Sequence, residues 1–153
     1  VIAGAPSQKY EFYQTFIKGE HIKFVNNQTY ALLSISTAAL VTSGTATLET
    51  ALFKVPQVVC YKANSISYAI AKRIITLRFI SLVNLIMNRE VVKELIQKKF
   101  TREYLKLELT KLLNEKTRNE MLANYEVLEE KLGGAGASEK TAHLILQKFQ
   151  QRK

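Results

Sequence analysis

An α/β fold, in which helices cover both faces of a parallel sheet, is predicted by two features of the sequence. Short apolar runs, of the kind found in strands buried on both faces, recur along the first 61 residues. Between these runs lie segments with helical spacing of apolar residues, long enough to serve as crossovers. This alternation is typical of βαβ units, whose parallel strands are joined by right-handed crossovers.

We expect four strands to lie side by side, at residues 1–4, 22–25, 38–41 and 57–61. Helices are expected between them over residues 7–17, where Ser7 is the candidate N-cap, over 30–35 and over 46–53. From residue 65 onward the pattern is helical. The expected segments are 67–77, an irregular apolar piece at 79–86, then 90–97, 101–113, 116–132 and 138–150.

The composition argues against several classes of protein. All thirteen acidic residues are Glu, so the chain has no Asp-rich metal site, EF-hand loop or Asp-based triad. The single cysteine, Cys60, lies in an apolar run, which favours a small buried hydrophobe over a nucleophile and permits no internal disulfide. Two distant histidines add no zinc cluster. No apolar stretch approaches the roughly 20 residues of a membrane-spanning helix.

The net charge of +9 is concentrated in one span. Between Lys54 and Arg102 there are ten Lys or Arg residues against two acidic ones, Glu90 and Glu94, which leaves +8. Such a span attracts phosphate groups, nucleic acid or anionic lipid surfaces. A solvated basic face without a partner is the simpler alternative.

The most informative motif is the junction between the third expected strand and the helix after it. Ser43, Gly44 and Thr45 replace the apolar run at the point where that helix begins, and unpaired amides at a helix start favour a phosphate group. Glu49 lies about one turn further on, where its carboxylate can accept hydrogen bonds from a ribose diol. The alternative is an ordinary helix cap followed by a surface glutamate.

Three further polar residues are candidate binding residues. Tyr61 lies at the carboxyl end of the fourth expected strand, where ligands of open α/β sheets bind, although it can also simply cover the edge of the core. Asn84 and Gln97 place amide groups beside apolar residues further along the chain.

Five segments, in this order and spacing, resemble those of lipid-A-disaccharide synthases. They are residues 43–52, 55–62, 71–73, 80–86 and 89–97. One departure is Val83, where the family is expected to have proline. The Ser-Gly-Thr helix start with its following glutamate is shared more widely by glycosyltransferases with two Rossmann-like domains.

The resemblance implies one half of a two-Rossmann, glycosyltransferase B type fold. Residues 1–132 are expected to form a Rossmann-like nucleotide-sugar-binding domain that is incomplete at its start, and residues 133–153 a hinge and a carboxyl-terminal helix. The implied reaction is an inverting transfer of 2,3-diacylglucosamine from its UDP derivative to 2,3-diacylglucosamine 1-phosphate, without metal or cofactor. The implied UDP-sugar-binding residues are Ser43, Gly44, Thr45, Glu49, Tyr61, Asn84 and Gln97.

The family also implies that the catalytic base lies in an amino-terminal domain outside this chain, so no catalytic residue is expected here. The expected location is the cytoplasmic face of the inner membrane, as a peripheral protein on an anionic surface. Two alternatives stay open: another UDP-sugar transferase or epimerase of the same superfamily, and a basic α/β module that binds RNA or an anionic membrane.

The last expected helix, residues 138–150, carries an apolar set that requires burial. Gly133, Gly134 and Gly136 precede it as a flexible joint. We expect the helix to pack on this chain's own sheet or to be exchanged with a second copy in a homodimer. A disordered end is the alternative. The apolar set consists of Ala142, Leu144, Ile145, Leu146 and Phe149.

Overall fold

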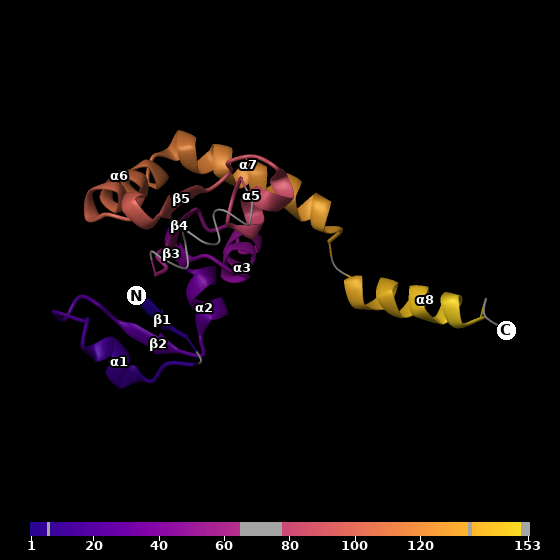
Figure 1. Cartoon of the computed structure of the whole chain (residues 1–153), viewed down its shortest axis with the longest axis horizontal. Coiled ribbons are helices and arrows are strands. Elements are labelled where there is room, and N and C mark those ends of the chain that lie inside the picture. Colours follow the sequence, from indigo (N-terminus) through magenta and orange to yellow (C-terminus); the bar gives the residue numbers. More distant parts are fainter. Residues whose placement is uncertain (6, 65–77, 135, 151–153) are drawn as a thin grey trace.

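The computed structural model describes residues 1–5, 7–64, 78–134 and 136–150 (Figure 1). Within them the strands are all parallel, and helices connect them, which confirms the predicted α/β class. The strands are β1 (Ile2–Gly4), β2 (Phe24–Asn26), β3 (Ala39–Thr42), β4 (Gln57–Tyr61) and β5 (Lys93–Ile96).

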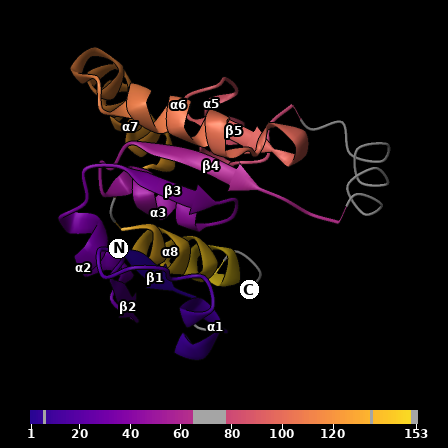
Figure 2. The same ribbon diagram turned by 90° about the vertical axis from the view of Figure 1, so that its left-hand side faces the viewer.

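The strands form two sheets instead of the single row that the sequence predicted. One sheet pairs β1 with β2, and the other has the order β3-β4-β5. The pairs β1–β2 and β3–β4 are each parallel as expected, but β1 and β2 share no hydrogen-bonded ladder with β3. Figures 1 and 2 place the small sheet on the β3 side of the larger one.

The helix predicted over residues 90–97 is wrong, because β5 and a short 3₁₀ turn, η1 (Gln97–Lys99), occupy this segment. Its apolar residues recur at a spacing that fits a helix face. However, the Asn84 side chain accepts hydrogen bonds from the Val91 and Val92 amides, at 2.7 and 3.0 Å, and β4 pairs with the residues that follow. Tertiary hydrogen bonds thus override the local pattern.

The helices are α1 (Tyr10–Gln14), α2 (Thr29–Ser34), α3 (Ala46–Leu52), α5 (Leu82–Met87), α6 (Arg102–Leu112), α7 (Glu115–Leu132) and α8 (Ala137–Gln150). Most agree with the predicted ranges to within a residue or two. Helix α1 is shorter than predicted, and it begins after Lys9, so that Ser7 does not cap it. The helix predicted at 67–77 lies outside the described residues.

Side-chain caps define the ends of several of these helices. The Thr101 and Asn114 side chains accept backbone amides at the starts of α6 and α7. Helix α7 ends at Gly133, which has φ 82° in the left-handed region that glycine adopts without strain.

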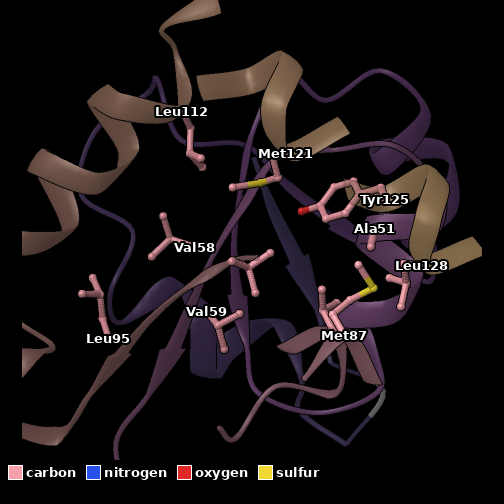
Figure 3. Packing of buried hydrophobic residues seen from close by; sticks show 11 residues of the cluster. Ala51, Val58, Val59, Met87, Leu95, Leu112, Met121, Tyr125 and Leu128 are labelled. Carbon is pink, nitrogen blue, oxygen red and sulfur yellow. The ribbon is translucent and has the colours of Figure 1, made fainter. Parts of the chain in front are cut away.

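The core lies around β4. Neighbouring residues of a strand point to opposite faces, and Val58 and Val59 are both fully buried, so both faces of β4 are covered. Figure 3 shows Leu112 of α6 on the side of Val58, while Tyr125 and Leu128 of α7 gather on the other side of the strand. Full burial of each such valine contributes about 1.5–3 kcal/mol to stability.

Helix α8 extends away from the two sheets (Figure 1). Its apolar side chains stay exposed, with Leu146 at 59% and Phe149 at 69% of their full accessible area. The predicted packing of this helix on the chain's own sheet is therefore wrong, and its exchange with a second copy stays a prediction. In the described part of the chain, no helix combines the length and apolar character needed to cross a membrane.

Candidate functional site

Strand register brings several of the predicted site residues to one edge of the larger sheet. Thr42 pairs with Cys60, and Tyr61 pairs with Ile96, so β3, β4 and β5 end almost level. Ser43 directly follows β3 and donates its amide to the Cys60 carbonyl at 3.3 Å. Gln97 directly follows β5. We call this row of strand ends the carboxyl edge.

The turn from β3 into α3 leaves backbone donors unused. The amides of Gly44, Thr45 and Ala46 have no acceptor within the described residues, and all three residues are exposed. The first hydrogen bond of α3 runs instead from the Thr47 amide to the Gly44 carbonyl, at 3.2 Å. Gly44 has φ 150°, which L side chains rarely adopt. Unpaired amides with the positive end of a helix dipole suit an anion.

The hydroxyl of Ser43 already donates a hydrogen bond within the chain. It donates to the Ile80 carbonyl at 3.0 Å, across 37 residues of sequence. A serine hydroxyl has one proton, so Ser43 can only accept a further hydrogen bond while this contact is made. Ser43 therefore adds no side-chain donor for an anion at this turn while it bonds to Ile80, and the unused backbone amides remain available.

Glu49 faces a hollow of about 440 Å³ on the side of the small sheet. Its carboxylate makes no ion pair or hydrogen bond with the described residues. The other lining residues belong to the loop after β2 and the start of α2, and the residues of the Ser43–Thr45 turn are not among them. The prediction that Glu49 and the turn share one crevice therefore stays a prediction. The lining residues are Asn27, Gln28, Thr29, Tyr30, Ala31 and Glu49.

Gln97 uses its side chain to hold backbone at the carboxyl edge. Its Oε1 accepts from the Ala63 amide, and its Nε2 donates to the Ala63 carbonyl, both at 3.1 Å. The pair continues the path of β4 beyond Tyr61, which is half-buried at the same edge. Gln97 thus positions the segment that carries Tyr61 and Lys62.

Asn84 lies inside the fold. The residue is fully buried, and its amide nitrogen donates to the Val92 carbonyl at 2.8 Å and to Glu94 Oε1 at 2.9 Å. Its oxygen accepts the Val91 and Val92 amides. All four hydrogen bonds that this side chain can make are made within the chain. Asn84 therefore holds the backbone at Val91 and Val92 and has no free donor or acceptor for a ligand.

Glu94, which was not among the predicted site residues, lies at the centre of these contacts. Its carboxylate accepts three donors: the amides of Ile80 and Ser81 and the side chain of Asn84. The helix predicted over 90–97 had hidden it as one residue of an amphipathic pattern. The sequence did contain a signal, because Glu94 is an acidic residue inside the otherwise largely apolar segment 91–96.

Exposed basic residues surround the carboxyl edge. Lys62 follows β4, Lys98 and Lys99 lie in η1 after β5, and Arg78 lies next to Phe79, with its guanidinium carbon 5.2 Å from the ring centre. None of the four forms an ion pair with the residues that the structure describes. This end of the sheet is therefore electrostatically suited to a phosphorylated or otherwise anionic ligand.

Cys60 does not have the character of a nucleophile. Burial raises the pKa of the Cys60 thiol to about 11, so this half-buried residue is a neutral thiol near pH 7. Among the described side chains, no three His, Cys or Glu groups lie together where they could hold a metal ion.

The fold and the site define an α/β domain of the class that binds ligands at the carboxyl edge of an open parallel sheet. Residues 8–148 match the family model described as lipid-A-disaccharide synthetase. The chain belongs to that family.

Curated relatives named lipid-A-disaccharide synthase support this membership. The protein of Syntrophus aciditrophicus (strain SB) is 36% identical over 126 residues, which cover 82% of this chain and 33% of the relative. That of Solibacter usitatus (strain Ellin6076) is 34% identical over 139 residues, covering 90% and 36%. That of Psychromonas ingrahamii (strain DSM 17664 / CCUG 51855 / 37) is 36% identical over 132 residues, covering 86% and 34%. The chain thus spans about a third of the length of these relatives.

Proposed function

We propose that this chain is the donor-binding part of an inverting glycosyltransferase of lipid A biosynthesis. The enzyme would transfer 2,3-diacylglucosamine from its UDP derivative to 2,3-diacylglucosamine 1-phosphate, forming lipid A disaccharide 1-phosphate and UDP. Family membership supports the reaction class. The observation that carries the donor-binding role is the set of exposed amides at Gly44, Thr45 and Ala46, close in the chain to the carboxylate of Glu49. None of these groups has a partner among the residues that the structure describes.

In the proposed donor site, two different structural features bind the phosphates and the ribose of the nucleotide. The turn amides hold phosphate oxygens, helped by the basic side chains Lys62, Lys98 and Lys99. Glu49 accepts hydrogen bonds from the ribose hydroxyls in the hollow beside α2. Ser43 and Tyr61 border the same edge, whereas Asn84 and Gln97 act through the backbone that they hold.

Titration of UDP and 2′-deoxy-UDP against the complete polypeptide that contains this chain tests the role of Glu49. Glu49→Ala should weaken UDP binding about 10- to 100-fold, the worth of a hydrogen bond to a charged group. The variant should also lose any preference for UDP over the deoxy compound. Glu126→Ala, an exposed glutamate on α7, is the control. Unchanged UDP affinity in Glu49→Ala would contradict the proposed role of Glu49 in binding the ribose.

The choice of sugar is tested with acylated and plain UDP-glucosamine derivatives. The proposal requires that the acylated donor is consumed with a diacylglucosamine 1-phosphate acceptor. Turnover of plain UDP-sugars alone would indicate another transferase or epimerase of the superfamily. Salt-sensitive RNA binding by the chain, with no protection by UDP, would instead indicate a basic interaction module.

The proposed place of action is the cytoplasmic face of the inner membrane, with the protein bound peripherally to an anionic surface. The exposed lysines at the carboxyl edge support this location, since each lysine near such a surface contributes about 1 kcal/mol. Replacing Lys98 and Lys99 with Gln should weaken binding to vesicles that contain anionic lipid. The same change at Lys116 and Lys131, both exposed on α7, is the control.

Two macromolecular partners belong to the proposal. One is the amino-terminal domain that would carry the acceptor site and the catalytic base. The other is a second copy of the chain, which would cover the exposed apolar residues of α8 by exchange of this helix. Light scattering of the complete polypeptide with Leu146 and Phe149 changed to Glu tests the exchange, which predicts a shift from dimer to monomer.

A further inference from the structure

Glu94 lies in β5, far in the sequence from the β3–α3 turn. Hydrogen bonds through Ile80 nevertheless link its carboxylate to that turn. Its two carboxylate oxygens accept from the Ile80 amide at 3.2 and 3.0 Å, and Oε1 also accepts from the Ser81 amide at 2.9 Å. The Asn84 side chain supplies a third donor at 2.9 Å. No cation pairs with this carboxylate in the described part of the chain.

Ile80 transmits this arrangement to the turn. Its amide is held by Glu94, while its carbonyl accepts the Ser43 hydroxyl at 3.0 Å. Ser43 is the residue that precedes the unpaired amides of Gly44, Thr45 and Ala46. One backbone residue therefore connects the carboxylate on β5 with the start of the turn.

The surroundings of Ile80 make this connection stiff. Ser81 is fully buried and caps α5, because its hydroxyl accepts the Asn84 amide at 3.2 Å. The Asn84 side chain is fully buried as well. Hydrogen bonds to a carboxylate are stronger than those between neutral groups. Three donors bonded to Glu94 hold the segment whose Ile80 carbonyl accepts the Ser43 hydroxyl.

We propose that Glu94 is a positioning residue for donor binding, which fixes the β3–α3 turn through the Ile80 backbone and the Ser43 hydroxyl. The inference rests on the proposed binding of UDP at this turn. In this arrangement Glu94 acts through the backbone that its carboxylate holds, and not by contact with the nucleotide.

Glu94→Gln tests the proposal, since it keeps the size of the side chain and replaces one acceptor oxygen with a donor group. That group would face amide donors, so at least one of the Ile80 and Ser81 bonds must break. Glu90→Gln is the matched control, because Glu90 is exposed and pairs only with Lys93 among the described residues. Both variants are made in the complete polypeptide.

In Glu94→Gln the KM for the UDP-sugar and the inhibition constant of UDP should rise by roughly 10- to 100-fold, the range that small misplacements of binding groups produce, while kcat changes less. Amide hydrogen exchange should accelerate at Ile80 and Ser81. Adding Ser43→Ala to this variant should raise the KM little further, because both changes break the same connection. If Glu94→Gln does not fold, Glu94→Asp replaces it, since it retains the charge and withdraws the carboxylate by one methylene.

Faster exchange with an unchanged KM would overturn the proposal and leave Glu94 a purely structural residue. Fully additive effects of the two changes on KM would overturn it too. Failure of donor binding itself has a different signature, because the unmodified polypeptide would then show no affinity for UDP.

Discussion

Gln97 holds Ala63 by both backbone groups, through one accepted and one donated hydrogen bond of 3.1 Å each. This contact joins the end of β5 to the chain leaving β4. It depends on an amide, because only an amide offers an acceptor and a donor side by side.

Gln97→Glu should therefore destabilise the protein although it keeps the shape of the side chain. The carboxylate cannot donate to the Ala63 carbonyl and would face it with a second oxygen. We expect a loss of about 1–3 kcal/mol in the free energy of unfolding, measured with urea. Gln147→Glu on the exposed surface of α8 is the control, and an equal stability of both variants would contradict the role of the contact.

Gly44→Ala should lower stability and, if the turn holds the donor as proposed, the affinity for UDP as well. A Cβ at this position meets nothing within 4 Å, so the cost arises from the φ of 150° and not from a clash. Strain of this kind costs on the order of 1–3 kcal/mol. Gly19, with φ 101° and open space around it, provides the matched control. Gly19→Ala should lose stability while UDP affinity stays the same; a loss of UDP affinity in both variants would show that the effect is not specific to the turn.

The buried pair of Gln57 and Tyr125 should show non-additive effects on stability. The Gln57 amide donates to the Thr47 carbonyl at 2.9 Å and to the Tyr125 hydroxyl at 3.3 Å, and both residues are almost fully buried. Tyr125→Phe alone takes away one partner and should cost about 1–3 kcal/mol. The double change Gln57→Leu with Tyr125→Phe should lower the free energy of unfolding by less than the sum of the single changes. It removes both groups of this hydrogen bond, so neither is left buried without the other. Urea unfolding of the four proteins completes the cycle, and strict additivity would contradict it.

Cys60 should react slowly with iodoacetamide in the folded protein. Its pKa is raised from about 9 to about 11 by burial, so that only a small fraction is thiolate at pH 8. The reaction rate should keep rising with pH up to about 11, while unfolded protein in urea reaches its plateau about two pH units lower. A folded-state plateau at pH 9 would contradict the burial of this thiol.

The parallel strands and most helices could be predicted because their signals are local. The apolar run before Ser43 and the cap at Thr101 depend on neighbouring residues in the sequence. The β5 segment could not be predicted in this way, because the hydrogen bonds that define it come from Asn84 and from β4. The same reason explains the candidate site. Glycine and hydroxyl residues at a strand end signal the turn locally, whereas the tertiary partners of Asn84, Glu94 and Gln97 become visible only in the folded chain.

The separation of the two sheets leaves β3 with an open side. Ala39 and Ser43 direct their amides to Pro56 and Cys60, so the alternation of the strand turns the backbone groups of Leu40 and Thr42 away from β4. No strand pairs with them in the described residues, and Leu40 is 50% exposed. An apolar strand with unsatisfied backbone groups is a template on which other extended chains assemble. A further strand or segment paired with this edge would also protect it from aggregation, and the chain should become more soluble when Leu40 is replaced by lysine.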